Sequence, residues 1–125
     1  MNKSGNASPT NTSVAILTGW TADGGYPGTS IVSNQLVIDR LGTVNVTARM
    51  VVSANTFGLT VTGYIYRNGV QIKTASSAAV TTLNLDTSGV SVSAGDTIDM
   101  RIVCSNSNGG ITIAAAGTYL QFDPA

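Results

Sequence analysis

The sequence of 125 residues contains no histidine and no glutamate, and its only cysteine is Cys104. Without histidine, the commonest general base and metal ligand of proteins is missing, so neither Ser-His-Asp nor Cys-His catalysis is possible within the chain. A single cysteine cannot form an intrachain disulfide, and without histidine it cannot build a zinc site. These absences indicate a protein that is not an enzyme and that needs no cofactor.

Charge is also scarce, since charged residues make up 10% of the chain and about 25% is usual. Six Lys and Arg balance six Asp, and this zero net charge gives no attraction toward nucleic acid or an anionic membrane. No stretch reaches the roughly 18 apolar residues of a membrane span, and residues 1–5 lack the apolar run of a signal peptide. A surface with so few charges has little colloidal protection, which is tolerable when much of it is covered inside an assembly.

The polar positions are filled by Ser, Thr, Asn and Gly, which favour strands and turns over helices. Residues 43–52 alternate between apolar and polar side chains, as a half-buried strand does. Residues 57–67 and 98–104 alternate in the same way, and Asn68-Gly69 after the first of them predicts a tight hairpin to residues 70–75.

Shorter apolar runs predict further strands at residues 14–17, 29–32, 35–38, 79–85, 111–114 and 118–122. This makes about eight to ten short strands with a turn every 8–12 residues, the spacing of a sandwich or jelly roll. We therefore expect residues 14–125 to form one all-β domain, an antiparallel β-sandwich of the jelly-roll type.

Residues 1–13 are almost entirely polar and are expected to form an extended N-terminal arm with nothing to bury. If the arm is ordered, a neighbouring subunit or a larger assembly is expected to hold it. The residues expected to anchor it on a capsid are Asn2, Lys3, Ser4, Asn6, Pro9 and Asn11.

Several charged and aromatic side chains fall on the predicted outward faces of strands. One interpretation is a solvated surface with cross-strand packing of the tyrosines. The other is an oligomer interface, in which paired tyrosines are common. The candidates for this interface are Arg49, Tyr64, Tyr66, Asp99 and Arg101.

Two further interpretations concern ligands. Trp20 and Tyr26 lie in or beside a Gly-rich loop, where Trp20 is either a lid over the core or an exposed contact, and the pair could stack on a sugar ring. Asp96 and Asp99 are the closest acidic pair, but they are expected to point to opposite faces, so a structural role is favoured over calcium binding, and Asp96 is expected to cap its turn. No cluster of Trp and Tyr marks the cleft that a two-carboxylate glycosidase would need.

The order of several segments resembles the trimeric jelly-roll family that includes tumour necrosis factor and the globular heads of complement-type proteins. The resemblance covers roughly residues 40–122, whereas residues 14–40 are not diagnostic. The segments that carry it are 42–48 (GTVNVTA), 64–70 (YIYRNGV), 83–85 (LNL) followed by 92–98 (VSAGDTI), and 117–122 (GTYLQF).

Similar domains occur in virion proteins of tailed bacteriophages. The composition of this chain, rich in Thr, Ser, Asn and Gly and poor in charge, resembles that of those proteins. The resemblance implies a homotrimeric decoration or cementing protein that binds and stabilises a phage head, with the major capsid protein or another virion protein as its partner and the virion, assembled in the host cytoplasm, as its location. The start at Met1 without a stalk is expected to favour decoration over a fibre. The alternative is a receptor- or glycan-binding tip domain of a tail or head fibre, with residues 19–28 and 105–110 as its contact surface.

Overall fold

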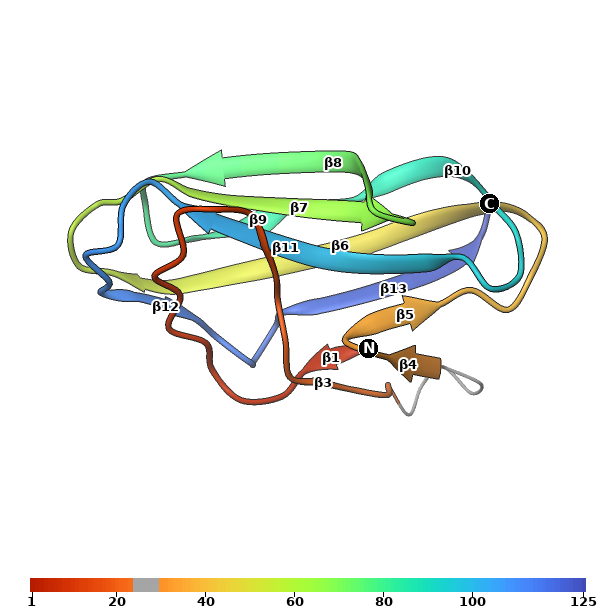
Figure 1. The fold of residues 1–125 in the computed structure, drawn as a ribbon, viewed down its shortest axis with the longest axis horizontal. Helices are drawn as coiled ribbons and strands as arrows, with labels where there is room; N and C mark the ends of the chain where they lie inside the picture. Colours follow the sequence, from red (N-terminus) through yellow and green to blue (C-terminus); the bar gives the residue numbers. More distant parts are fainter. Residues whose placement is uncertain (24–29) are drawn as a thin grey trace.

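The computed structural model describes residues 1–23 and 30–125, which form an all-β antiparallel sandwich of two facing sheets (Figure 1). These residues contain no helix, and therefore none that could cross a membrane. The all-β sandwich predicted from the sequence is confirmed. Tyr26, one of the two expected loop contacts, lies outside the described residues.

Sheet A is built around the long strand β6 (Gly42–Asn55), which has strands on both sides. The order across the sheet is β10 (Thr87–Val92), β6, β13 (Tyr119–Pro124), β1 (Asn2–Lys3) and β3 (Trp20–Thr21). The far half of β6 pairs instead with β9 (Thr81–Asn84) and β12 (Ile111–Ile113).

Sheet B has the order β4 (Ser30–Val32), β5 (Gln35–Val37), β11 (Thr97–Cys104), β7 (Val61–Arg67) and β8 (Val70–Ser77). The short strand β2 (Ala15–Ile16) also pairs with β11. Four of the strand pairs are nested along the chain, β1 with β13, β5 with β11, β6 with β10, and β7 with β8. The pairs β6–β13 and β7–β11 join these within each sheet.

The core lies between the sheets and follows the alternation of the sequence. On β6 the apolar set is almost fully buried, and β7 and β11 bury their matching faces in the same way. Each fully buried apolar side chain contributes roughly 1.5–3 kcal/mol to folding. The β6 residues concerned are Val44, Val46, Ala48, Met50 and Val52.

The predicted hairpin between β7 and β8 is present. Asn68 and Gly69 have φ of 49° and 77°, the left-handed values that the tight turn requires. The strand predicted over residues 57–67 begins later, at Val61, because residues 56–60 form a turn after β6. The side chain of Asn55 closes this turn, since its Oδ1 accepts from the Leu59 N–H at 3.0 Å and its Nδ2 donates to the Leu59 oxygen at 2.7 Å.

The expectation that residues 1–13 have nothing to bury is wrong. Met1 is 1% exposed and belongs to the core, and Lys3 is also buried. β1 lies between β13 and β3, with Asn2 opposite Tyr119 and Lys3 opposite Trp20. The short strands β1 and β3 escaped prediction because two-residue strands carry no periodicity.

The same N-terminal segment then crosses from sheet A to sheet B. Ala7 bridges Ile113 of β12, with N–H···O distances of 2.9 and 2.8 Å. Farther along, the Asn11 oxygen accepts from the Cys104 N–H of β11 at 2.9 Å, and β2 continues along the same strand. The segment therefore follows one edge of the sandwich and bonds to both sheets of its own domain.

Asp96 caps its turn, as the sequence predicts. Its Oδ2 accepts from the Ser93 N–H at 2.9 Å and from Arg67 Nε at 3.2 Å. The Ser93 N–H, together with Asn68 and Arg67, holds the pKa of Asp96 below its ordinary value because each favours the ionised carboxylate.

This lowered pKa predicts a specific pH dependence of stability. The contribution of Asp96 is complete above the unfolded-state pKa of about 3.9 and is lost as the pH falls through the lower folded-state value. We expect Asp96→Asn to lower the melting temperature at neutral pH, and we expect the difference between the two proteins to shrink as the pH falls below about 3.9 and the wild-type carboxylate takes up its proton. Thermal melts of both proteins between these pH values test this, and a constant difference across the range would contradict it.

Candidate functional site

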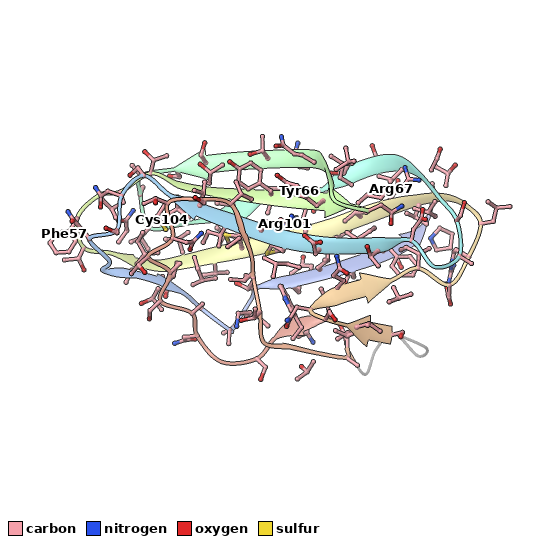
Figure 2. The ribbon with its side chains drawn as sticks, viewed as in Figure 1. Phe57, Tyr66, Arg67, Arg101 and Cys104 are labelled. Atoms are coloured by element: carbon pink, nitrogen blue, oxygen red, sulfur yellow. The ribbon has the colours of Figure 1, made fainter. Side chains whose placement is uncertain are left out.

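The candidate site is the outer face of sheet B, where β7 and β11 lie side by side. Tyr66 is opposite Asp99 and Tyr64 is opposite Arg101, so the four side chains share one face. We call this set the tyrosine–arginine face; Figure 2 labels Tyr66 and Arg101 near the middle of the molecule. The structure thus brings together four of the five residues expected at an interface.

The aromatic part of this face is held by ring contacts. The rings of Tyr64 and Tyr66 meet edge to face, with centroids 6.0 Å apart and planes at 77°. The guanidinium carbon of Arg101 lies 4.1 Å from the centroid of the Tyr66 ring, within the range of a cation–π interaction. These contacts fix the orientation of the two rings.

Asp99 lies beneath these groups, with its side chain only 1% exposed. Arg101 donates to it through Nε at 2.7 Å and Nη2 at 3.1 Å, and Gln35 Nε2 donates to Oδ2 at 2.8 Å. The hydrogen bonds that Arg101 donates to Asp99 raise the pKa of Arg101, so the guanidinium stays charged. The acid and the base neutralise each other, and the face therefore presents no net charge from this pair.

Apolar side chains extend the tyrosine–arginine face. Ile16 of β2 lies opposite Arg101, and Val103 of β11 lies opposite Thr62. Val14, two residues before Ile16, is 42% exposed. The sequence could not single out Ile16, because the apolar run 14–17 has no alternation to show which side chain faces outward. The face as a whole combines aromatic, aliphatic and guanidinium surface, and tyrosine and arginine are among the side-chain types that are enriched at protein interfaces.

Arg49 does not join this set, because it lies on β6 in sheet A. It pairs with Asp86 and contacts Asn84 Oδ1 at 3.4 Å. Burial raises the pKa of Asp86, but the bonds from Arg49 and from the Ala48 N–H outweigh it, so the pKa lies below its ordinary value. Arg49 is thus engaged within its own sheet, away from the tyrosine–arginine face.

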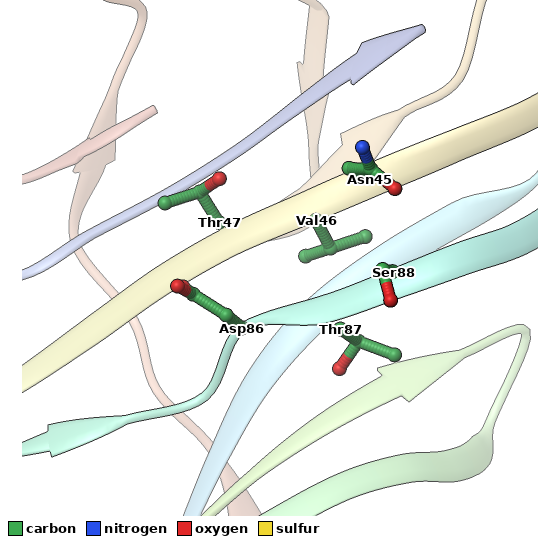
Figure 3. A pocket seen from close by; sticks show the side chains of 6 residues that line it. All are labelled: Asn45, Val46, Thr47, Asp86, Thr87 and Ser88. Atoms are coloured by element: carbon green, nitrogen blue, oxygen red, sulfur yellow. The ribbon is translucent and has the colours of Figure 1, made fainter. Parts of the chain in front are cut away.

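A shallow hollow lies beside this ion pair, between β6 and β10 (Figure 3). It measures about 270 Å³ and lies where the register of the two strands shifts between Thr87 and Val90. One oxygen of Asp86 is occupied by Arg49 and Ala48, and Asn45 Oδ1 accepts from the Gly89 N–H. These bonds hold one oxygen of Asp86 and the side-chain oxygen of Asn45 within sheet A. Its lining consists of Asn45, Val46, Thr47, Asp86, Thr87 and Ser88.

Trp20 acts as a lid over the core, one of the two interpretations of the sequence. It is 9% exposed, and its Nε1 donates to the Leu17 oxygen at 2.7 Å. The alternative, an exposed Trp20 that stacks on a sugar, is therefore wrong. Of the expected contact surface, β3 lies well away from the loop that joins β11 to β12 (Figure 1), and residues 24–28 lie outside the described residues.

The residues expected to anchor the arm are largely engaged within the domain. Lys3 Nζ donates to the oxygens of Ser4 and Gly5 at 3.2 and 3.0 Å, and burial lowers the pKa of Lys3.

Two asparagines of the expected anchor bond to other strands and loops of the domain. Asn6 Oδ1 accepts from the Ala115 N–H at 2.9 Å, and Asn11 Nδ2 donates to the Ile102 oxygen at 2.7 Å. The thiol of Cys104 contacts the oxygen of Pro9 at 3.9 Å. Asn2 and Ser4 remain exposed.

Chemistry at these positions is limited. Within residues 1–23 and 30–125, no three His, Cys, Asp or Glu side chains are grouped to hold a metal ion. Burial raises the pKa of the Cys104 thiol, which disfavours the reactive thiolate.

Comparison of the sequence with protein-family models and with curated proteins finds no significant match. Function is therefore inferred from the surfaces of the molecule itself.

Proposed function

We propose that this chain is a non-enzymatic virion structural protein: a homotrimeric jelly-roll decoration protein that binds a phage head and stabilises it. The observation that carries the proposal is the preformed, charge-balanced tyrosine–arginine face on sheet B. Such a face serves contact with protein surfaces, and the neutral, sparsely charged chain is suited to a covered position in an assembly.

The nested strand pairing supports the jelly-roll part of the proposal. Rolling up one long antiparallel hairpin pairs the first strand with the last and the innermost strands with each other. The pairs β1–β13, β5–β11, β6–β10 and β7–β8 follow this pattern. The two sheets of the resulting sandwich leave one broad outer face each for contacts.

The balance of charge on the tyrosine–arginine face supports self-association in particular. Copies of one chain bring like groups near one another, and a net charge on the shared surface would repel. The pair of Asp99 and Arg101 cancels within the face, so copies can approach without that cost. Tyrosine and arginine are also enriched at the buried centres of interfaces.

The shell contact in this proposal uses the folded edge of the sandwich. Lys3, Asn6 and Asn11 are engaged within the domain, whereas Asn2 and Ser4 are exposed there. A trimer presents this edge three times, and linked sites bind far more tightly than one site alone.

The proposal is tested by adding the purified chain to heads of candidate tailed phages stripped of small accessory proteins. We expect the wild type to sediment with the heads and to raise their melting temperature. Tyr66→Ala should weaken head binding by about tenfold or more because it disrupts the multivalent trimer. Leu41→Ala is the control, since Leu41 is 82% exposed just before β6 and belongs to neither surface, and it should bind normally. Equal binding by the Tyr66 and Leu41 variants would contradict a role for the tyrosine–arginine face.

A further inference from the structure

The end of the molecule where β6 finishes carries an exposed aromatic side chain that the sequence did not single out. Phe57 is 60% exposed, and Figure 2 shows it at the tip, far from Arg67 at the other end. A single exposed apolar residue is ordinary on a protein surface. Phe57 differs because three loops converge to hold it in place.

The turn that carries Phe57 is bonded to both neighbouring loops. Asn55 Nδ2 donates to the Leu59 oxygen and to the Ala78 oxygen, at 2.7 and 3.1 Å, and so joins the turn to the β8–β9 loop. The loop after β11 is joined by two bonds between Thr60 and Ser105, of 3.0 Å each. Little conformational freedom remains to be lost when a ligand binds this turn, and this favours affinity.

The backbone of Gly110 packs against the turn that carries the Phe57 ring. The Thr56 N–H donates to the Gly110 oxygen at 2.9 Å, and the φ of Gly110 is +75°. A Cβ atom at this position would lie 2.8 Å from Thr56 Cβ and 3.2 Å from Phe57 Cδ2. The turn thus packs directly against the glycine backbone.

No charged residue occurs in any segment that forms this end of the molecule. Residues 8–13, 53–60, 76–82 and 105–113 contain no Asp, Glu, Lys or Arg. The polar side chains exposed around Phe57 are those of Thr, Ser and Asn, with Ser105, Asn106, Ser107 and Asn108 in one loop. These groups bind neutral hydroxyl and amide groups, and they offer no ion pair to an anionic or cationic ligand.

We propose that the Phe57 end binds neutral glycans, with a pyranose ring stacked on Phe57 and its hydroxyl groups bonded to the surrounding Asn, Ser and Thr side chains. The apolar face of a pyranose matches an aromatic ring, and its rim of hydroxyls matches neutral donors and acceptors. This site gives the receptor- or glycan-binding alternative a location in place of Trp20. It lies on loops that are separate from the tyrosine–arginine face, so the proposed glycan site does not depend on the proposed decoration function.

The test is binding of the full-length chain to an array of neutral hexose and N-acetylhexosamine glycans beside sialylated and sulfated ones, followed by saturation-transfer NMR with methyl glycosides. We expect signals on neutral glycans and no preference for anionic ones. Phe57→Ala and Phe57→Leu should each lose binding by about tenfold or more, because stacking needs an aromatic face, whereas Phe57→Trp should retain it. Leu41→Ala is the matched control, since Leu41 is 82% exposed before the opposite end of β6.

Three results would overturn the proposal. The first is the absence of any neutral-glycan signal from the folded wild-type chain. The second is binding that survives in Phe57→Ala. The third is retention by Phe57→Leu, because a general apolar contact with a protein partner, rather than a stacked sugar, would then explain the site. The oligomeric state of each variant is measured alongside and should not change.

Discussion

Deletion of residues 1–13 should destabilise the sandwich by about 3–6 kcal/mol, a large share of the 5–15 kcal/mol that holds a typical domain folded. Burial of Met1 alone contributes roughly 1.5–3 kcal/mol. Each lost hydrogen bond adds about 0.5–1.5 kcal/mol, and the bonds from Lys3 N–H to the Thr118 oxygen and from Leu120 N–H to the Met1 oxygen, both of 2.9 Å, are among them. Urea unfolding followed by far-ultraviolet circular dichroism measures the change.

The matched control is the double substitution Ser4→Ala and Ser8→Ala, since both serines are exposed in the same segment. We expect its unfolding midpoint to equal that of the wild type. A deletion variant with an unchanged midpoint would show that the N-terminal segment is a separable arm, as the sequence first suggested.

Met50→Ala should cost about 2–5 kcal/mol, the range for truncating a large buried side chain. Met50 is fully buried on β6 and fills the space in front of Gly63 on the facing strand β7. A Cβ atom at Gly63 would lie 3.1 Å from Met50 Cε and 3.2 Å from Leu85 Cδ1. Trp20, the only tryptophan and a buried one, gives a fluorescence signal for unfolding in both parent and variant.

The same packing predicts that Gly63→Ala has opposite effects on the free energy of unfolding in the wild type and in Met50→Ala. In the wild type the added methyl group overpacks the core and should cost on the order of 1 kcal/mol. In Met50→Ala the added methyl group enters the space left by the methionine side chain. Because alanine also reduces the conformational freedom of the unfolded chain, Gly63→Ala should stabilise this variant by about 0.4–1 kcal/mol. Equal effects of Gly63→Ala in the two backgrounds would contradict direct packing of Met50 against Gly63.

The strands that the sequence predicted well are those with long alternation or a specific turn. Apolar and polar side chains alternate without a break over residues 43–52, so the sequence alone predicts which face of β6 is buried. Asn68-Gly69 fixed the β7–β8 hairpin because few other residue pairs accept its backbone angles. The outward placement of Tyr64 and Tyr66 followed from the same alternation.

The features that escaped prediction depend on contacts between distant parts of the chain. Met1 is buried only because β1 lies between β13 and β3, and a two-residue strand leaves no pattern. For Asp99 the alternation left both a solvated surface and an oligomer interface open, and it did not show that Arg101 and Gln35 enclose the carboxylate. Phe57 belonged to a predicted strand, and its exposed position depends on the turn that Asn55 closes. In each case tertiary packing, and not local propensity, decides the outcome.

Sedimentation velocity of the purified chain tests most directly the claim that the tyrosine–arginine face assembles copies of this protein. We predict a single species of three times the 12.7-kDa chain mass, shifted toward monomer by Tyr66→Ala and left intact by Tyr119→Ala. A wild-type chain that stays monomeric at every concentration up to about the millimolar range, where even weak association is populated, would contradict it.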